Sequence, residues 1–429
     1  MLGKRTVFAA GILGLAGLSI GGCPQPPAGG DGNGNGNGSG GGNLQVIVTD
    51  HIVDGELKVG RGFVAFGVDS GSGINFVRKG SVASAINLSN SLSLMSSGFN
   101  VAGTWILSRE FDGSVYFYDT ATDTLVTVPT NTLALASGSA LLDEFWSDGD
   151  YAVTLADATK VSDGLPIKLI DCTTNPPTIT SFTQTPPMPT VSRSGERPQC
   201  AVDAENREFI VQIVDLLYLY SFDDPTGAPQ VFDLSGEGGI SNSISIFLED
   251  RFVLYHDHEG VSDGRDVTRL ADLSGGLVYN LAQNPSAPED VFLRDGFFGY
   301  FVEQTDADIN TNTQYRSVFG QIGANGPEFT LISTTDKAIK NNDPDQGLFG
   351  YGQTVAITSN GKYRFIAGDG TAANIAEYLQ VSVNGGAFKT LEDPEDNDEA
   401  GIFGSNVVAT DEACAFTTLD QRLALILLP

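Results

Sequence analysis

Short apolar segments separated by turn residues run through the chain from Leu44 onward, and none shows the 3.6-residue period of an amphipathic helix. The clearest segment is SVYFYDTATDTLVTVP, residues 114–129, which predicts two strands joined by a turn. Val115 and Phe117 are expected on one face of the first strand and the two tyrosines on the other, because side chains alternate along a strand. The pattern therefore predicts an all-β protein.

Eight tight turns recur along the chain, and each is followed by a strand with aromatic or β-branched residues. The turn residues are Gly62, Gly103, Gly149, Asn206, Asp250, Gly296, Gly361 and Glu412. A four-stranded propeller blade takes roughly 40–45 residues plus insertions, and every interval between successive turns fits one such blade. The sequence thus predicts a single eight-bladed β-propeller over residues 44–429, with seven blades as the alternative if one unit is an irregular insertion.

The last unit of this region lacks one strand, and the region begins with one extra strand. The eighth unit stops one strand short at Pro429, and Leu44–Thr49 is a strand that precedes the first unit without a blade. Pairing Leu44–Thr49 with Arg422–Leu428, as the outer strand of the last blade, removes two open sheet edges. We therefore expect the N-terminal strand to close the ring.

The connections of the predicted propeller differ between its two faces. With the strands of a blade named A to D from the axis outward, the A–B and C–D connections share one face and the B–C and D–A connections share the other. The A–B turns are tight in all eight units, and long insertions fall on the opposite face. These insertions are residues 157–165, 256–268, 305–314 and 368–376 between B and C, and 183–198, 333–350 and 391–402 between D and A. Long loops commonly carry binding residues, so the long-loop face of blades five to eight is the candidate site.

The N-terminus has the features of a targeting signal. Basic residues 4–5 precede the small apolar segment Val7–Ile20, which is too short to span a bilayer comfortably. The Ile-Gly-Gly-Cys sequence ending at Cys23 resembles the bacterial lipoprotein signal, in which the cysteine is diacylated and becomes the mature N-terminus. The resemblance implies a signal peptide over residues 1–22 and lipidation of Cys23. Because Pro24 rather than Asp follows, it also implies an outer-membrane lipoprotein that faces the periplasm or the exterior.

Residues 23–43 follow as a Gly- and Asn-rich segment that serves as a flexible linker. Over the whole chain, 53 acidic and 23 basic side chains give a formal net charge of −30. This acidity argues against a nucleic-acid partner, whose phosphates require a basic surface. No later apolar stretch approaches transmembrane length, so the lipid is the expected contact with the membrane.

The segment of residues 114–129 also resembles the repeats of bacterial YVTN-type and TolB-type propellers, with an aromatic strand, an Asp-Thr turn and a valine-rich outer strand. Those families are mainly binding or scaffolding propellers. The resemblance implies a protein or glycan partner of the cell envelope, and it carries over no catalytic residue. The alternative is a propeller enzyme, a hydrolase or lyase acting on polysaccharide or lactone, with calcium as its candidate cofactor.

Three polar groups are candidate ligands. Asp306, Asp308, Asn310 and Asn312 are spaced like the start of a calcium loop, although the glycine and glutamate of a full loop are replaced; a polar loop is the alternative. His256 and His258 form a His-x-His pair that could hold Zn²⁺, with exposed loop histidines as the alternative. The sharpest acidic run is Asp393, Glu395, Asp396, Asp398 and Glu399. This run is either a solvated loop or a site for a cation or a basic protein surface, and in the latter case binding weakens as salt rises.

Three cysteines remain beyond Cys23. Cys172 is expected at the end of a strand on one face of the propeller, and Cys200 at the start of a strand on the other. A strand of four or five residues separates these levels by about 13–17 Å, beyond the Cα separation of about 7 Å that a disulfide tolerates. Cys414 lies in another blade. All three are predicted to be free and buried.

Overall fold

The chain divides into two compact units, Met1–Gly42 and Asn43–Pro429, and every residue described below lies in the second. The computed structural model describes residues 44–68, 73–88, 99–109, 114–129, 133, 145–155, 166–185, 198–235, 246–259, 265–283, 292–294, 296–305, 312–323, 326–332, 338–340, 355–358, 361–367, 379–392, 394, 405–418 and 420–429. Within these ranges, no helix combines the length and the apolar character needed to cross a membrane.

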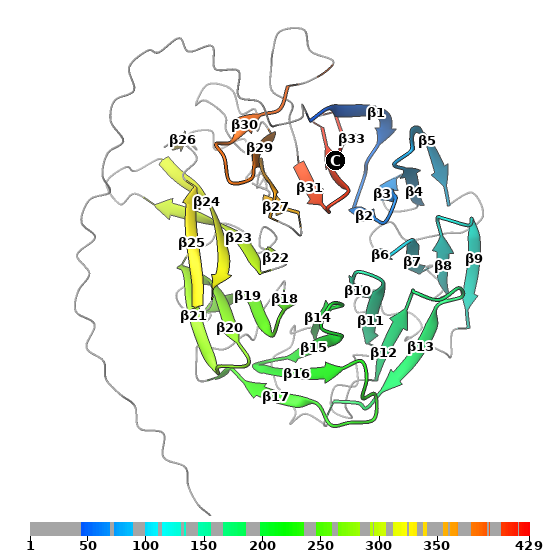
Figure 1. The fold of residues 1–429 in the computed structure, drawn as a ribbon, viewed down its shortest axis with the longest axis vertical. Coiled ribbons are helices and arrows are strands. Elements are labelled where there is room, and N and C mark those ends of the chain that lie inside the picture. Colours follow the sequence, from blue (N-terminus) through cyan, green and yellow to red (C-terminus); the bar gives the residue numbers. More distant parts are fainter. Residues whose placement is uncertain are drawn as a thin grey trace, which may run out of the picture. The chain divides into compact units, whose positions relative to one another are not determined.

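Eight antiparallel sheets follow one another around a ring, and each is one propeller blade (Figure 1). Blades 1 and 2 are β2 (Leu57–Gly60), β3 (Phe63–Val68), β4 (Gly73–Arg78) and β5 (Ser81–Asn87), then β6 (Asn100–Ala102), β7 (Trp105–Arg109), β8 (Val115–Asp119) and β9 (Thr124–Val128). Blades 3 and 4 are β10 (Phe145–Asp148), β11 (Tyr151–Leu155), β12 (Ile167–Asp171) and β13 (Thr178–Phe182), then β14 (Gln199–Asp203), β15 (Glu208–Ile213), β16 (Leu216–Ser221) and β17 (Gln230–Asp233).

The second half of the ring repeats this order. Blades 5 and 6 are β18 (Ile246–Glu249), β19 (Phe252–Glu259), β20 (Arg265–Asp272) and β21 (Leu277–Gln283), then β22 (Phe292–Arg294), β23 (Phe297–Thr305), β24 (Asn312–Gly323), β25 (Gly326–Ile332) and β26 (Ala338–Lys340). Blades 7 and 8 are β27 (Val355–Ile357), β28 (Tyr363–Ala367), β29 (Leu379–Val383) and β30 (Lys389–Thr390), then β31 (Ser405–Ala409), β32 (Ala413–Thr417), β33 (Arg422–Leu427) and β1 (Val46–Ile52). Eight blades are observed, so the seven-bladed alternative is wrong.

The N-terminal strand closes the ring as predicted. β1 pairs antiparallel with β33, and the register places Val46 opposite Ile426 and Val48 opposite Ala424. The hydroxyl of Thr49 donates a hydrogen bond of 2.9 Å to the carbonyl oxygen of Leu423. The first and last strands of the described residues are therefore neighbours in one sheet, which closes the ring.

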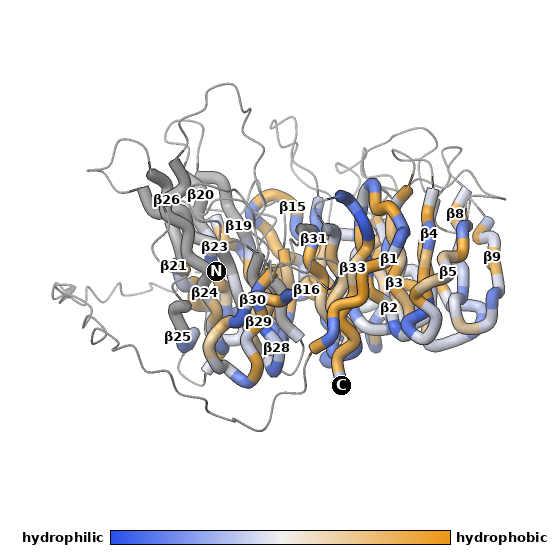
Figure 2. Tube along the Cα trace, turned by 90° about the horizontal axis from the view of Figure 1, so that it is seen from above, coloured by the Kyte–Doolittle hydropathy of each residue, from blue (hydrophilic) through white to orange (hydrophobic). Residues whose placement is uncertain are grey.

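Apolar side chains fill the spaces between neighbouring blades. Val115 and Phe117 pack in the cluster shared by blades 2 and 3, whereas Tyr116 and Tyr118 pack against the cluster shared by blades 1 and 2. The alternation predicted for this strand is thus confirmed, and it lets one strand contribute to two interfaces. Figure 2 shows the same concentration of apolar residues along β3, β4 and β33. Cys172, Cys200 and Cys414 are buried in these interfaces, and none of the three is in a disulfide bond, as expected.

Two predicted insertions are shorter than the sequence suggested. Residues 256–268 were expected to form a loop, but β19 continues to Glu259 and β20 begins at Arg265, with His256 opposite Thr268 in the ladder. In blade 6 the hairpin of β23 and β24 extends in the same way, and β24 gains an additional partner in β26. At the end of a hairpin, backbone hydrogen bonds alone can keep polar residues in a strand. The sequence there lacks the apolar alternation that predicts a strand, so the longer hairpins were not predicted.

Candidate functional site

The two faces of the propeller differ in the length of their connections. What we call the short-turn face carries the A–B connections, which are tight turns such as residues 61–62 and 103–104, and the C–D connections. The opposite, long-connection face carries the D–A connections, among them residues 129–144, 183–198 and 391–404. The longest B–C connections, also on that face, are residues 156–166 in blade 3 and 368–378 in blade 7. The predicted asymmetry between the faces is therefore confirmed.

Most of the predicted site residues lie outside the described residues. These are Cys23, Asp306, Asp308, Asn310, Asp393, Glu395, Asp396, Asp398 and Glu399. Asn312 is the first residue of β24, opposite Lys340 of β26. His256 and His258 lie in β19 rather than in a loop, opposite Thr268 and Asp266 of β20. Among the described residues, no group of three or more His, Cys, Asp or Glu is arranged to hold a metal ion.

Backbone hydrogen bonds join the A–B turns of blades 1, 2 and 3 on the short-turn face. The backbone N–H of Arg61 donates to the carbonyl oxygen of Gly103 at 2.9 Å, and the N–H of Gly103 donates to that of Gly149 at 2.7 Å. Both glycines have a positive φ, and a Cβ on Gly103 would lie 2.0 Å from Oδ1 of Asp150. Glycine at this position therefore allows the turns of blades 1, 2 and 3 to come into contact.

Acidic side chains extend the same chain of contacts to the neighbouring blades. Oε2 of Glu412 accepts a hydrogen bond of 3.0 Å from the N–H of Gly62, which links blade 8 to blade 1. Oδ2 of Asp148 accepts from the N–H of Ala204 at 2.9 Å, and Oδ2 of Asp203 accepts from the N–H of Asp250 at 2.9 Å. Asp148 and Asp203 are both the last residue of strand A, and sequence reasoning missed this recurring acid.

Ion pairs between blades also lie near the short-turn face. They are Arg61–Asp150 at 2.8 Å, Lys79–Glu412 at 2.6 Å and Arg251–Glu208 at 2.6 Å. Beside the Arg251–Glu208 pair, a pocket of about 160 Å³ is lined by residues of blade 4, including Asp224 and Gln230. On the described part of the short-turn face, these three ion pairs therefore connect residues of different blades.

In the Lys79–Glu412 pair the pKa values of both partners are shifted. The hydrogen bond from Lys79 holds the pKa of Glu412 below its usual value, and the N–H of Gly62 acts in the same direction. Burial lowers the pKa of Lys79, and this outweighs the opposing effect of Glu412. The two partners therefore shift for different reasons, and the charged form of Lys79 depends on the carboxylate beside it.

We expect the contribution of Glu412 to stability to depend on pH. A depressed carboxyl pKa adds stability that is fully present above the usual value of 4.5 and is lost as pH falls through the lower folded value. The free energy of unfolding of Glu412→Gln should therefore be lower than that of the natural chain by at most about 1 kcal/mol above this pH, because Glu412 is half exposed. The difference, measured by urea unfolding, should shrink toward zero below pH 4.5 and be smaller in a Lys79→Met background. A difference that stays constant with pH would contradict this assignment.

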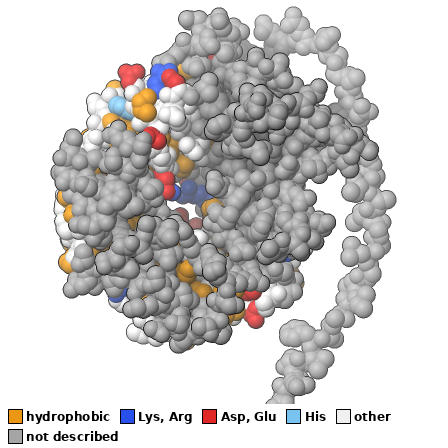
Figure 3. Space-filling model, turned by 180° about the vertical axis from the view of Figure 1, so that it is seen from behind, with side chains coloured by type: hydrophobic (Ala, Val, Ile, Leu, Met, Phe, Trp, Pro, Cys, Tyr) orange, Lys and Arg blue, Asp and Glu red, His pale blue; other side chains and the backbone are white. Residues whose placement is uncertain are grey.

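The centre of the ring is hollowed on the side seen in Figure 3, where basic and acidic side chains lie close together inside the opening. This view is turned by 180° from that of Figure 1. The charged groups seen inside the opening belong to the described part of the chain.

No family model matches the chain, and no curated protein matches it. BamB from Moraxella catarrhalis is similar in structure, with 12% identity, a TM-score of 0.45 and coverage of 90% of this chain and 99% of that one. Saccharomyces cerevisiae Sqt1 has 10% identity, a TM-score of 0.48 and coverage of 89% and 98%. The β-propeller domain of the Trilobed protease from Pyrococcus furiosus has 7% identity, a TM-score of 0.36 and coverage of 86% and 79%. At these identities and TM-scores the comparisons assign neither a family nor a function, and the resemblance to YVTN-type and TolB-type repeats stays a prediction.

Proposed function

We propose that this propeller is a binding or scaffolding module of the cell envelope, held there by a lipid on Cys23. The observation that supports this proposal best is the difference between the two faces. Tight turns close the A–B side of every blade, and long connections, such as residues 368–378 in blade 7 and 391–404 between blades 7 and 8, lie on the other side. Binding residues are commonly placed on long loops supported by a rigid sheet scaffold. The long-connection face of blades five to eight is therefore the proposed binding surface.

Charge suggests the chemistry of the partner. On the short-turn face, Asp150, Glu208 and Glu412 each pair with a basic side chain of another blade. The acidic run from Asp393 to Glu399 falls instead in the connection between β30 and β31, which belongs to the long-connection face. A formal net charge of −30 leaves most carboxylates without a basic residue to neutralise them. We therefore propose a partner with a basic protein surface, bound directly or through Ca²⁺.

A capture experiment tests this function. The Cys23→Ser chain, which we expect in the soluble fraction instead of the membrane fraction, is immobilised and exposed to membrane extract at low and high salt. Replacing Asp393, Asp396 and Asp398 by Asn should reduce capture of partner proteins at least threefold at about 50 mM salt, where charges are weakly screened. The reduction should largely disappear at about 500 mM, where exposed charges are screened within a few ångströms.

The matched control removes three acidic charges from the short-turn face. It carries Glu205→Gln, Asp224→Asn and Asp411→Asn, in or beside the turns of blades 4 and 8. This variant has the same net charge as the Asp393/Asp396/Asp398 variant, so a general effect of acidity would appear in both. Equal capture by the natural chain and the two variants at both salt concentrations would refute the proposed surface.

A further inference from the structure

The eight blades have equivalent positions in their strands, and at one buried position a single blade has an arginine where the others have apolar residues. The second residue of strand B is apolar in the other seven blades and no more than 1% exposed. These residues are Val64, Ile106, Ala152, Phe209, Val253, Phe298 and Cys414. In blade 7 the same position, the second residue of β28, is Arg364. A charge at a position that is otherwise fully apolar is costly unless a partner compensates it, and such departures from the local pattern are expected at functional sites.

The guanidinium of Arg364 lies at the interface between blades 6 and 7. Its central carbon is 5.9 Å from the centre of the Phe319 ring in β24. The Phe319 ring stacks in turn on Phe388, with 6.0 Å between centroids and 23° between planes. Phe388 belongs to the connection between β29 and β30, so this cluster lies toward the short-turn face. Phe319 thus lies beside the guanidinium, and Phe388 lies beside Phe319.

Arg364 lacks a polar partner within the described part of the chain. Its Nε is buried without a hydrogen bond, while the residue as a whole is only half-buried. Burial lowers the pKa of Arg364, and no carboxylate of the described residues acts in the opposite direction. By contrast, Arg61 and Arg251 each pair with a carboxylate of another blade.

Two other arginines of the same chain contact both an aromatic ring and a carboxylate. Arg78 lies 5.4 Å from the centre of the Phe76 ring and donates a hydrogen bond of 2.5 Å to Oδ1 of Asp123. Arg207 lies 5.5 Å from the centre of the Phe222 ring and donates to Oδ1 of Asp223 at 2.9 Å. In both cases an aromatic ring covers the face of the guanidinium and a carboxylate occupies its edge. Arg364 has the aromatic ring without a carboxylate from the described residues.

We propose that Arg364 binds a carboxylate supplied by a ligand, at a site between blades 6 and 7 on the short-turn side. The fork of guanidinium N–H groups matches the two oxygens of a carboxylate, and ion pairing in a partly buried site compensates the desolvation of the charge. The carboxylate comes either from a small organic acid or from a polypeptide terminus. The site does not depend on the proposed function of the long-connection face, because the two surfaces lie at opposite ends of the strands.

Thermal unfolding of the full chain tests the site with defined probes. Sodium acetate, a short peptide with a free C-terminus and the same peptide with a C-terminal amide are compared at constant ionic strength, with chloride as the reference. Acetate or the peptide acid should raise the unfolding midpoint of the natural chain by a few degrees, and the peptide amide should not. Arg364→Leu should abolish this rise, and Arg364→Lys should require at least tenfold more ligand, because lysine lacks the planar fork. A response to acetate identifies a small acid as sufficient, whereas a response to the peptide acid alone identifies a polypeptide terminus.

A second measurement separates a ligand site from a structural role. Without ligand, Arg364→Leu should unfold at the same or a higher temperature than the natural chain, since leucine matches the apolar residues of the other blades. Arg207→Leu, the matched control, should lower the midpoint because it breaks a formed contact with Asp223. A midpoint lowered by Arg364→Leu, or an equal response of the natural chain and Arg364→Leu to every carboxylate, would overturn the proposal. A response to inorganic phosphate that exceeds the response to acetate and is lost in Arg364→Leu would also overturn it.

Discussion

Removal of the first strand should destabilise the whole ring. A chain that begins at Val53 lacks β1, whereas a chain that begins at Asn43 keeps it. Without β1, the backbone edge of β33 is open and the side chains that β1 covers lose their partners. Burying one large aliphatic side chain contributes about 1.5–3 kcal/mol, and Val46 and Val48 both pack against the blade 7–8 cluster. We expect the free energy of unfolding to fall by about 4–6 kcal/mol.

The midpoint of urea unfolding is measured for the two chains, with tryptophan fluorescence as the signal. The chain that begins at Asn43 is the control for loss of the N-terminal segment. If both chains unfold at the same urea concentration, β1 does not contribute to the ring and the closure is wrong. A second consequence of an open edge is association between chains, so size-exclusion chromatography should show oligomers only for the chain that begins at Val53.

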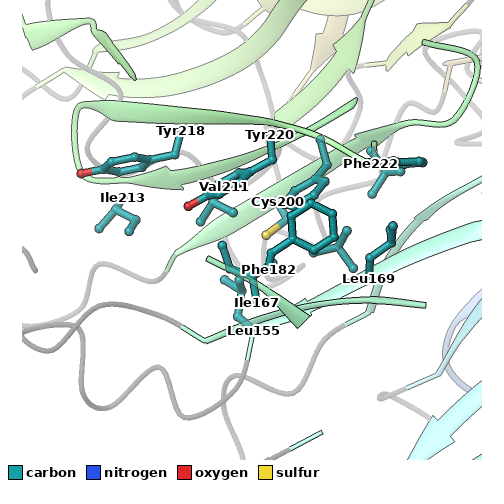
Figure 4. Packing of buried hydrophobic residues seen from close by; sticks show 13 residues of the cluster. Leu155, Ile167, Leu169, Phe182, Cys200, Val211, Ile213, Tyr218, Tyr220 and Phe222 are labelled. Carbon is teal, nitrogen blue, oxygen red and sulfur yellow. The ribbon is translucent and has the colours of Figure 1, made fainter. Parts of the chain in front are cut away.

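The second large effect is expected in the core between blades 3 and 4. Phe209 is fully buried there, and its ring stacks on Tyr220 with 4.9 Å between centroids and 7° between planes. Phe182 meets it edge to face at 5.0 Å. Figure 4 shows how Phe182, Tyr220 and Phe222 come together from the two blades. Because the surrounding strands are paired on both sides, they can close only part of the cavity left by Phe209→Ala.

Phe209→Ala should therefore lower the free energy of unfolding by about 3–5 kcal/mol. Val231→Ala is the matched control, because Val231 lies on the outer strand of the same blade and is 49% exposed. Its effect should stay within about 0.5 kcal/mol. Urea unfolding of both variants provides the comparison. Equal effects of the two substitutions would mean that Phe209 does not lie in the core of this interface.

The fold could be predicted because its signals are local and repeated. Each blade needs one tight A–B turn, and glycines such as Gly103 and Gly149 mark these turns by spacing alone. Alternation in residues 115–118 assigned each side chain to one of two faces, and the structure places them in two different interfaces. Closure of the ring by the N-terminal strand could be predicted because the last blade lacks one strand and the region begins with one extra strand. None of these inferences required knowledge of contacts between distant residues.

The candidate site could be predicted only in part. Loop length identified the long-connection face, but the hydrogen bonds of the short-turn face join residues far apart in sequence, such as Asp148 and Ala204. The one available signal was the acid that ends strand A in consecutive blades. Arg364 was missed because a basic residue inside a short strand looks like an ordinary solvent-facing position. Only alignment of equivalent positions across the blades shows that it replaces an apolar residue.

An engineered disulfide between the first and last strands tests the closed eight-bladed ring most directly. Val48 and Ala424 are opposite each other in the register, and paired residues of antiparallel strands have Cα atoms about 4.5–5.5 Å apart, within the range that a disulfide accepts. Under mild oxidation, Val48→Cys with Ala424→Cys should form a crosslink within one chain. Val48→Cys with Leu423→Cys should not, because a shift of one residue places the side chain on the other face of the sheet. A crosslink between chains, no crosslink, or equal crosslinking of both pairs would contradict the closure of the ring by β1.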